Sequence, residues 1–235
     1  MSIDYIHGYS AIEQERLIQQ AQYWQDRLIL RDLNYCQGKS LLEIGCGARA
    51  VLGILGKAFP GLKLAGIDRE AKQINYARQY LQSLNLTDVD LRLGDASQLP
   101  WQDNTFDYIY GIWFLEHVNN PKPILDEAYP VLKPGGTITL TETDYRTIAI
   151  YPDLQDYNYL RNSLSELLFA AGGNPYVGQN LATVLSNSCF KKISNIPLGF
   201  HYSNSTDRNE LSKFIDYIYA WLEPTKEDAI AKLAK

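Results

Sequence analysis

The stretch "SLLEIGCGARAVLG", Ser40 to Gly53, decides the fold. A short apolar run ends in an acid, two glycines follow one residue apart, and an apolar run then resumes. This pattern predicts a strand over 41–44, a tight turn at Gly45-Cys46-Gly47 and a helix over 49–59. Because glycine has no Cβ, a ligand can approach the backbone of this turn closely.

Strand and helix patterns continue to alternate downstream of this turn. Further strands are expected over 62–67, 89–93, 106–112 and 137–143, and further helices over 70–84 and 121–132. Alternation with short connections is typical of a parallel sheet with helices on both faces. The sequence therefore predicts an α/β fold with a Rossmann-like, doubly wound and mostly parallel sheet.

The flanking segments are expected to cover this sheet. Ser10-Ala-Ile-Glu13 is a capping box, and the helix that it opens reaches about Leu30 as an N-terminal lid. A helical insertion is expected after the fifth strand, followed by a strand over 192–202 and helices over 208–222 and 226–233. We interpret residues 1–235 as a single domain, divided into a lid (1–38), a core (39–145), a cap insertion (146–188) and a C-terminal strand with helices (189–235).

The composition of the chain narrows the classes of partner. Its 235 residues are 46% hydrophobic and carry a formal charge of −5, which indicates a globular protein that repels nucleic-acid backbones. The three cysteines, Cys36, Cys46 and Cys189, form neither a C-x-x-C pair nor a metal-ligand spacing. The N-terminal stretch lacks the regions of a signal peptide, and no apolar run is long enough to span a membrane. We therefore expect a cytoplasmic protein with no metal, nucleic-acid or membrane partner.

Acidic residues stand near the ends of three predicted strands. Asp68 ends the second strand and can accept both hydroxyls of a ribose. Asp95 follows the third strand and can accept a hydrogen bond from the exocyclic amine of adenine, with Leu99 and Trp101 beside the ring. Glu43, two residues before the first glycine, suits a positively charged amino group better than a pyrophosphate. The glycine spacing alone also fits a dinucleotide fingerprint, so a nicotinamide site, a methyl-donor site and a purely structural turn stay open at this point.

Five segments, taken in order, resemble the class I S-adenosylmethionine-dependent methyltransferases. They are "LLEIGCG", "LAGID", "GDASQLPW", "FDYIYGIWFLEHV" and "LKPGG", and they span about Ser40 to Tyr145. The resemblance implies an enzyme that moves a methyl group from S-adenosylmethionine to an acceptor and leaves S-adenosylhomocysteine as product. Segments outside this core look like those of small-molecule methyltransferases, so we expect a small, partly apolar acceptor.

The resemblance also implies which residues contact the cofactor. The methionine part is expected beside Glu43 and the turn Gly45-Cys46-Gly47, the ribose beside Asp68, Arg69 and Gln73, the adenine beside Asp95 and Ala96, and the sulfonium beside Gly111, Ile112 and Trp113. Arg49 departs from the family pattern, which commonly has a glycine at this position. We expect its side chain to point away from the cofactor, with an anionic group of the substrate as the alternative target.

Four residues are candidates for catalysis, namely His117, Glu142, Asp144 and His201. In-line methyl transfer depends mainly on orientation, and a general base is needed only where the acceptor must lose a proton. The two acids share one face of the fifth strand near its carboxyl end, and histidine titrates in the useful range. For His117 a structural role in the cofactor site is the alternative.

Two other functions stay open on the sequence. One is an NAD-dependent oxidoreductase, and the other is a non-catalytic protein of the same fold that binds S-adenosylmethionine or a nucleoside. The sheets of the resembled family usually end with an antiparallel pair of strands, and this sequence has no convincing last strand. An edge left open in this way would allow two copies to associate as a homodimer.

Overall fold

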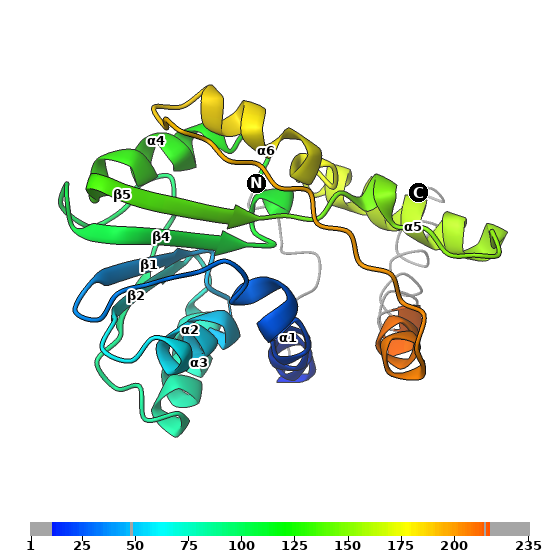
Figure 1. Ribbon diagram of the computed structural model, residues 1–235, viewed down its shortest axis with the longest axis horizontal. Coiled ribbons are helices and arrows are strands. Elements are labelled where there is room, and N and C mark those ends of the chain that lie inside the picture. The colour runs from blue at the N-terminus through cyan, green and yellow to red at the C-terminus, as the bar shows by residue number, and fades with distance from the viewer. Residues whose placement is uncertain (1–10, 48, 214, 217–235) are drawn as a thin grey trace, which may run out of the picture.

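The computed structural model describes residues 11–47, 49–213 and 215–216. Its centre is a sheet of five parallel strands in the order β3-β2-β1-β4-β5 (Figure 1). The strands are β1 (Ser40–Ile44), β2 (Lys63–Asp68), β3 (Asp90–Leu93), β4 (Phe106–Ile112) and β5 (Leu132–Thr141). The predicted parallel α/β fold is therefore confirmed.

Helices cover both faces of this sheet, as Figure 1 shows. The helices are α1 (Ala11–Trp24), α2 (Ala50–Ala58), α3 (Ala71–Ser83), α4 (Lys122–Val131), α5 (Gln155–Ala170) and α6 (Val177–Ser186). Helices α1, α2 and α3 lie on one side, and α4 and α6 lie on the other. A π-helical turn, Gln25–Ile29, extends α1 nearly to the predicted end of the first helix.

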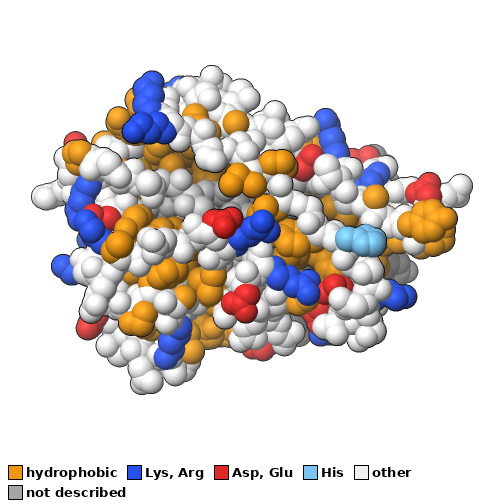
Figure 2. Space-filling model, viewed as in Figure 1, with side chains coloured by type: hydrophobic (Ala, Val, Ile, Leu, Met, Phe, Trp, Pro, Cys, Tyr) orange, Lys and Arg blue, Asp and Glu red, His pale blue; other side chains and the backbone are white. Residues whose placement is uncertain are grey.

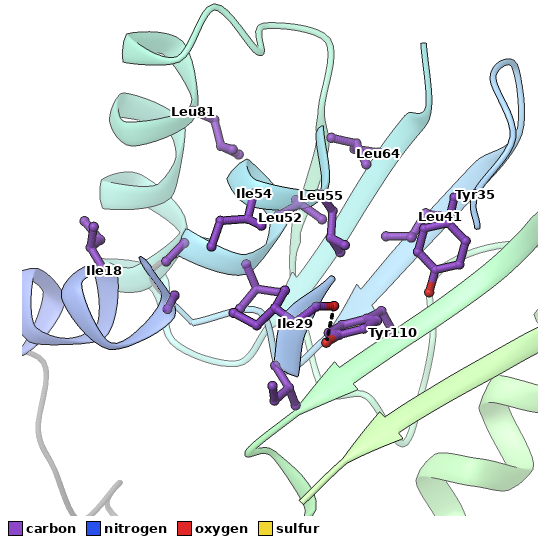
Figure 3. Close-up of a cluster of buried hydrophobic side chains, with 14 residues drawn as sticks. Ile18, Ile29, Tyr35, Leu41, Leu52, Ile54, Leu55, Leu64, Leu81 and Tyr110 are labelled. Carbon is purple, nitrogen blue, oxygen red and sulfur yellow. Dashed lines mark hydrogen bonds between the residues drawn. The ribbon is translucent and has the colours of Figure 1, made fainter. Parts of the chain in front are cut away.

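The face covered by α1 and α2 holds one of the two main apolar cores (Figure 3). Leu41 of β1 and Leu52 and Leu55 of α2 are fully buried in it. The Tyr110 hydroxyl donates a hydrogen bond to the carbonyl of Ile29 at 3.2 Å, which joins β4 to the π-helical turn. Burial of both sheet faces explains why the central strands β1, β2 and β4 are mostly apolar, whereas the edge strands β3 and β5 are more exposed and more polar.

The amino ends of the central strands are joined by an ion cluster around Asp107. This carboxylate accepts hydrogen bonds from Lys39 Nζ at 3.0 Å, from Lys133 Nζ at 2.7 Å and from the Ser40 N–H at 3.0 Å. Burial opposes the charge on Asp107, but these donors outweigh it and lower the pKa of the carboxyl well below its usual value. The cluster ties β1, β4 and β5 together at the edge opposite the strands' carboxyl ends.

The Lys133-Pro134-Gly135-Gly136 segment is a bulge inside β5 rather than a turn that precedes it. Leu132 pairs with Phe106 and Thr137 pairs with Tyr108, so the register shifts between these two pairs. Gly135 has φ +82°, a conformation that glycine adopts without strain. The fifth strand consequently begins before the predicted residue 137 and ends at Thr141.

The predicted strand over 192–202 is wrong. This segment has no sheet partner among the described residues, and most of it is exposed. Its alternating apolar residues suggested a strand, but Phe200 packs against Trp24 of α1 instead, with ring centroids 4.7 Å apart. Pro197 also removes one backbone donor that a sheet would use. Residues 205–213 are helical, so this helix begins three residues before the predicted residue 208. Ser10 and the predicted helix 226–233 lie outside the described residues.

Candidate functional site

One large cavity opens at the carboxyl ends of the strands, where the strand order reverses between β1 and β4. This is where open α/β sheets bind ligands. Its volume is about 1450 Å³, more than the roughly 300–1,000 Å³ of typical ligand pockets, so it has room for more than one small molecule. The predicted site residues that line it are Glu43, Gly45, Cys46, Gly47, Asp68, Arg69, Gln73, Asp95, Ala96, Ile112, Trp113, His117, Glu142 and Asp144.

Two predicted site residues, Gly111 and His201, are not part of the described cavity lining. Gly111 lies within the sheet packing, since a Cβ there would come within 3.0 Å of Leu140 and 3.2 Å of Ile44. His201 is exposed in the extended segment before residue 205. The structure therefore does not bring His201 together with the other three catalytic candidates.

The glycine turn after β1 is held open by Asp68. Asp68 Oδ2 accepts the Gly47 N–H at 2.8 Å, and Oδ1 accepts the Glu70 N–H at 3.0 Å. Gly45 has φ +65°, and a Cβ on it would overlap the Phe114 ring at 2.1 Å, so no other residue fits there. Because a carboxylate offers about four acceptor positions, Asp68 keeps acceptor capacity for a ligand hydroxyl.

Buried polar atoms without a partner concentrate at the cavity. Among the described side chains these atoms are Tyr35 Oη, Glu43 Oε2, Arg49 Nε and Nη2, Gln73 Oε1 and Glu116 Oε2. All of them except Tyr35 Oη belong to residues of the cavity lining. Since buried polar groups are nearly always hydrogen-bonded, this concentration indicates a polar ligand at the end of β1.

Glu43 and Arg49 lie together beneath the glycine turn. Glu43 is 3% exposed, and burial raises its pKa to about 8, an effect that the nearby Arg49 opposes. Arg49 is fully buried and donates from Nη1 to the Gly47 carbonyl at 2.6 Å. Its side chain lines the cavity, so the expectation that it points away from the cofactor is not supported.

Asp95 is held in its ionised form by the turn that follows β3. Asp95 Oδ1 accepts the Ser97 N–H at 2.8 Å and the Ser97 hydroxyl at 2.7 Å, which lowers the pKa of Asp95. Ala96 beside it is buried and lines the cavity. Trp101, expected beside the adenine, instead donates to Asp90 at 2.8 Å and is outside the described lining. Leu99 is buried in the other apolar core.

The turn after β4 is built around Glu142. Its Oε1 accepts the N–H groups of Phe114 at 3.0 Å and Leu115 at 2.7 Å, and its Oε2 accepts that of Glu116 at 3.2 Å. These donors begin the 3₁₀ turn Leu115–His117, whose free N–H groups need acceptors. Glu142 thus acts as a remote cap, and this contact fixes the wall of the cavity that carries His117.

Glu116 is a buried acid of this site that the sequence analysis missed. It is 4% exposed, its Oε1 accepts the Tyr145 hydroxyl at 3.4 Å, and burial together with Glu142 raises its pKa well above the usual value. Burial also lowers the pKa of His117 to about 4. His117 Nε2 lies 3.5 Å from Glu116 Oε1, and because the pKa of the imidazole is about 4 this contact is not an ion pair at neutral pH.

The cap packs directly on this acid cluster. The Asn174 N–H donates to the Glu116 carbonyl at 2.8 Å, and a Cβ on Gly173 would come within 2.2 Å of the same carbonyl oxygen. Asp144 lies on the cavity side, half-buried, with its Oδ1 accepting the Arg146 N–H at 3.1 Å. No sequence signal marked Glu116, because its burial results from the docking of a segment more than fifty residues away.

Aromatic and apolar side chains form the wall opposite the strand ends. Trp24 of α1 packs against Phe200 and Tyr202, with centroid distances of 4.7 and 6.3 Å, and all three line the cavity. The segment that carries Phe200 and Tyr202 is held to α1 by Asp207. This carboxylate forms an ion pair with Arg27 at 2.9 Å and accepts a hydrogen bond from the Tyr23 hydroxyl at 3.1 Å. Figure 2 shows hydrophobic side chains spread over the middle of the face that this segment crosses.

The part of the chain that the structure describes contains no group of three His, Cys, Asp or Glu side chains arranged to hold a metal ion. Within the same residues, none of the helices combines the length and apolar character required to traverse a bilayer.

Comparison with known proteins connects this geometry to a family. Residues 42–140 match the family described as "Methyltransferase domain". The chain is 32% identical over 174 residues to an uncharacterized 37.1 kDa protein in transposon TN4556 of Streptomyces fradiae, which covers 73% of this chain and 49% of that protein. It is 31% identical over 123 residues to demethylmenaquinone methyltransferase of Oceanobacillus iheyensis, 52% of each chain. The crystal structure of a SAM dependent methyltransferase from Aquifex aeolicus has the same fold, with a TM-score of 0.54 and 20% identity over 70% of this chain and 89% of that one.

The matched domain, the strand order and the cavity define one class of protein, the class I S-adenosylmethionine-dependent methyltransferases. Residues 42–140 match the methyltransferase domain, and over this range the chain is similar to members of that class. The chain spans about half the length of the two curated relatives described above.

S-adenosylmethionine is the cofactor of this family, and the residues at the strand ends fit it. The buried Glu43 Oε2 without a partner suits the ammonium of the methionine part. Asp68 retains acceptor positions for the ribose hydroxyls. Asp95 is ionised and can accept the adenine amine.

Proposed function

We propose that this chain transfers a methyl group from S-adenosylmethionine to a small, partly apolar acceptor. The observation that carries the proposal is a single cavity in which acids at three strand ends face an aromatic wall. The acids match the polar parts of the cofactor, and the remaining volume is available to an acceptor. When bound, the cofactor supplies a methyl group on a positively charged sulfur, already activated for displacement.

The character of the acceptor follows from the wall made by Trp24, Phe200 and Tyr202. Aromatic faces favour planar or apolar groups, and they also attract a cation such as a sulfonium. Several curated relatives are named demethylmenaquinone methyltransferase. A ring compound of that kind therefore heads the list of acceptors that we propose.

Orientation is the main catalytic contribution that we assign to the protein, and it can supply roughly 7–11 kcal/mol of a barrier. For acceptors that must lose a proton we propose Asp144 as the base, because it lies half-buried at the cavity and one described N–H occupies only one of its oxygens. We assign positioning roles to Glu142, which holds three N–H groups, and to His117, which stays neutral and weakly basic. We assign no catalytic role to His201, because it is exposed and lies outside the described cavity lining.

Calorimetry with S-adenosylmethionine, S-adenosylhomocysteine and NAD tests the cofactor. We expect the two adenosyl ligands to bind and NAD not to bind, because Glu43 offers acceptor oxygens at a place where a pyrophosphate would need hydrogen-bond donors. Binding of NAD alone would refute the proposal in favour of an oxidoreductase.

Turnover is then tested by mass spectrometry with a panel of quinols, phenols and amines that includes demethylmenaquinone. We expect an acceptor that gains 14 Da, the mass of a methyl group in place of a hydrogen. Tight binding of S-adenosylhomocysteine without turnover of any acceptor would instead support a binding protein of this fold.

We also propose that two copies associate through β5 and that the protein works in the cytoplasm. Among the described strands, β5 has a sheet neighbour on one side only, and Cys36, Cys46 and Cys189 are all free thiols. Light scattering of the purified chain tests the first point, with a monomer at micromolar concentration as the contrary result. Fractionation of cells that express the chain tests the second.

A further inference from the structure

Arg49 occupies an unusual position for a charged side chain. Its backbone has φ +65° and ψ +16°, the left-handed conformation that glycine adopts freely and other residues adopt at a cost. Its side chain is nevertheless fully buried at the start of α2, where it lines the cavity. A buried cation in a strained backbone conformation needs a compensating interaction.

Two of the three guanidinium nitrogens of Arg49 are buried without a hydrogen-bond partner among the described residues. Nη1 donates to the Gly47 carbonyl at 2.6 Å, while Nε and Nη2 have no hydrogen-bond partner among the described residues. These two nitrogens form one side of the planar fork that binds a carboxylate through two parallel hydrogen bonds. Gly66 of β2 lies beside this fork, since a Cβ there would be 2.9 Å from Cys46 Sγ and 3.4 Å from Arg49 Nε.

The group beside Arg49 is the buried acid Glu43. Glu43 of β1 pairs with Gly66 of β2 in the sheet register. Because Arg49 Nε lies near Gly66, Glu43 is on the strand next to the guanidinium. Glu43 Oε2 also has no described partner, and the two side chains are not within ion-pair distance of each other, unlike the ion pairs found elsewhere in the described chain. An acceptor, Glu43 Oε2, and two donors, Arg49 Nε and Nη2, are therefore all buried without a partner near the glycine turn.

We propose that Arg49 binds the carboxylate of an α-amino acid group on the nucleoside ligand, while Glu43 binds its ammonium. This inference rests on the proposed function, since it takes the ligand to be S-adenosylmethionine or S-adenosylhomocysteine. It assigns a ligand-binding role to the residue at which this chain departs from the glycine common in its family. The alternative is that Arg49 serves only to offset the charge of Glu43 within the folded chain.

Three ligands separate these possibilities in calorimetric titrations. S-adenosylhomocysteine carries both charges of the amino acid group, its decarboxylated analogue carries only the ammonium, and 5′-methylthioadenosine carries neither. For the unmodified chain we expect S-adenosylhomocysteine to bind 10- to 100-fold more tightly than the decarboxylated analogue, the range of a charge-assisted bidentate contact. In Arg49→Met we expect this ratio to fall below threefold, while the affinity for 5′-methylthioadenosine stays within threefold of the original.

Matched variants distinguish the fork from charge alone. Arg49→Lys keeps the charge but loses the planar fork, so the ratio should be intermediate. Arg31→Met removes an exposed arginine from the lining of the same cavity and should leave the ratio unchanged. Arg49→Gly restores the residue that favours the backbone conformation, so it provides a folded variant without the cation if Arg49→Met does not fold.

The outcomes bear separately on the inference and on the function. A ratio near one in the unmodified chain, or a ratio that persists in both Arg49→Met and Arg49→Gly, overturns the inference and leaves the proposed function intact. Equal weakening of all three ligands in those variants also overturns it, because it would mark a structural role. Failure of the unmodified chain to bind any of the three ligands refutes the proposed function and the inference together.

Discussion

Glu142→Ala should destabilise the protein and loosen the wall of the site, because this carboxylate is the acceptor for three backbone N–H groups. A buried donor left without an acceptor costs about 1–3 kcal/mol. Water from the cavity can reach part of this turn, so we take the low end for each group and expect a loss of about 3 kcal/mol. For a chain of this length that corresponds to a fall in melting temperature of roughly 6–12 °C.

The loss should also depend on pH, and its sign follows from the raised pKa of Glu142. Burial raises this pKa above its ordinary 4.5, so the native state resists the charged form, and the penalty for ionising Glu142 grows as the pH rises above that value. The alanine variant loses the three hydrogen bonds at every pH but escapes this penalty. The difference in unfolding free energy should therefore be larger at pH 5.5 than at pH 8.5.

Urea unfolding followed by tryptophan fluorescence at these two pH values measures both effects. Glu127→Ala is the matched control, because Glu127 lies on α4 and accepts a single backbone N–H, that of Leu99 at 3.1 Å. We expect the loss of this single hydrogen bond to cost about 1 kcal/mol. If Glu142→Ala costs no more than Glu127→Ala at pH 5.5, the three hydrogen bonds do not hold the turn and the reasoning is refuted.

Three further changes test other parts of the structure. Asp68→Ala should weaken S-adenosylhomocysteine at least tenfold by calorimetry, because it removes both the ribose acceptor and the acceptor for Gly47 N–H, and unchanged affinity would count against the ribose assignment. The affinity for S-adenosylhomocysteine should rise between pH 6 and pH 8, because the pKa of Glu43 is about 8 and only the ionised carboxylate pairs with an ammonium. The Glu43→Gln variant should bind this ligand weakly and show no such rise. Asp107→Asn should lower the free energy of unfolding at pH 7 by roughly 1–3 kcal/mol. This loss should shrink below pH 4, because the stability that the lowered pKa of Asp107 provides is lost as the pH falls toward that pKa. A difference in unfolding free energy that stays constant down to pH 2 would contradict the role of the ion cluster.

The part of the fold that the sequence predicted is the part governed by local periodicity. The predicted bounds of the first four strands differ from the observed ones by about a residue, because each strand is an apolar run bounded by a turn or an acid. Parallel strands place their carboxyl ends at one edge of the sheet, so Glu43, Asp68 and Asp95 could be placed together without coordinates. The turn after β1 could also be predicted, because the positive φ angles of Gly45 and Gly47 are conformations that glycine adopts freely.

The errors arise where distant segments decide the outcome. Segment 192–202 has the alternation of a strand, but the partner for its apolar face is Trp24 rather than a neighbouring strand. The burial of Glu116 depends on Gly173 and Asn174 of the cap. Alternation and burial alone do not identify a partner, so neither result could be read from the local sequence.

The two ends of the cavity are lined by different kinds of side chain. Glu43 on β1 and Arg49 at the start of α2 are an acid and a base buried at fixed positions, which suits a ligand that always carries an ammonium and a carboxylate. Around Trp24, Phe200 and Tyr202, the contacts are apolar and come from segments outside the sheet, which suits a ligand recognised by shape. A strongly charged acceptor would lose hydration against these rings, at a cost of several kcal/mol unless a charged side chain of the lining, such as Arg31, compensated it. The placement of charge at the strand ends and of aromatic rings opposite them therefore favours an invariant cofactor and a weakly polar acceptor.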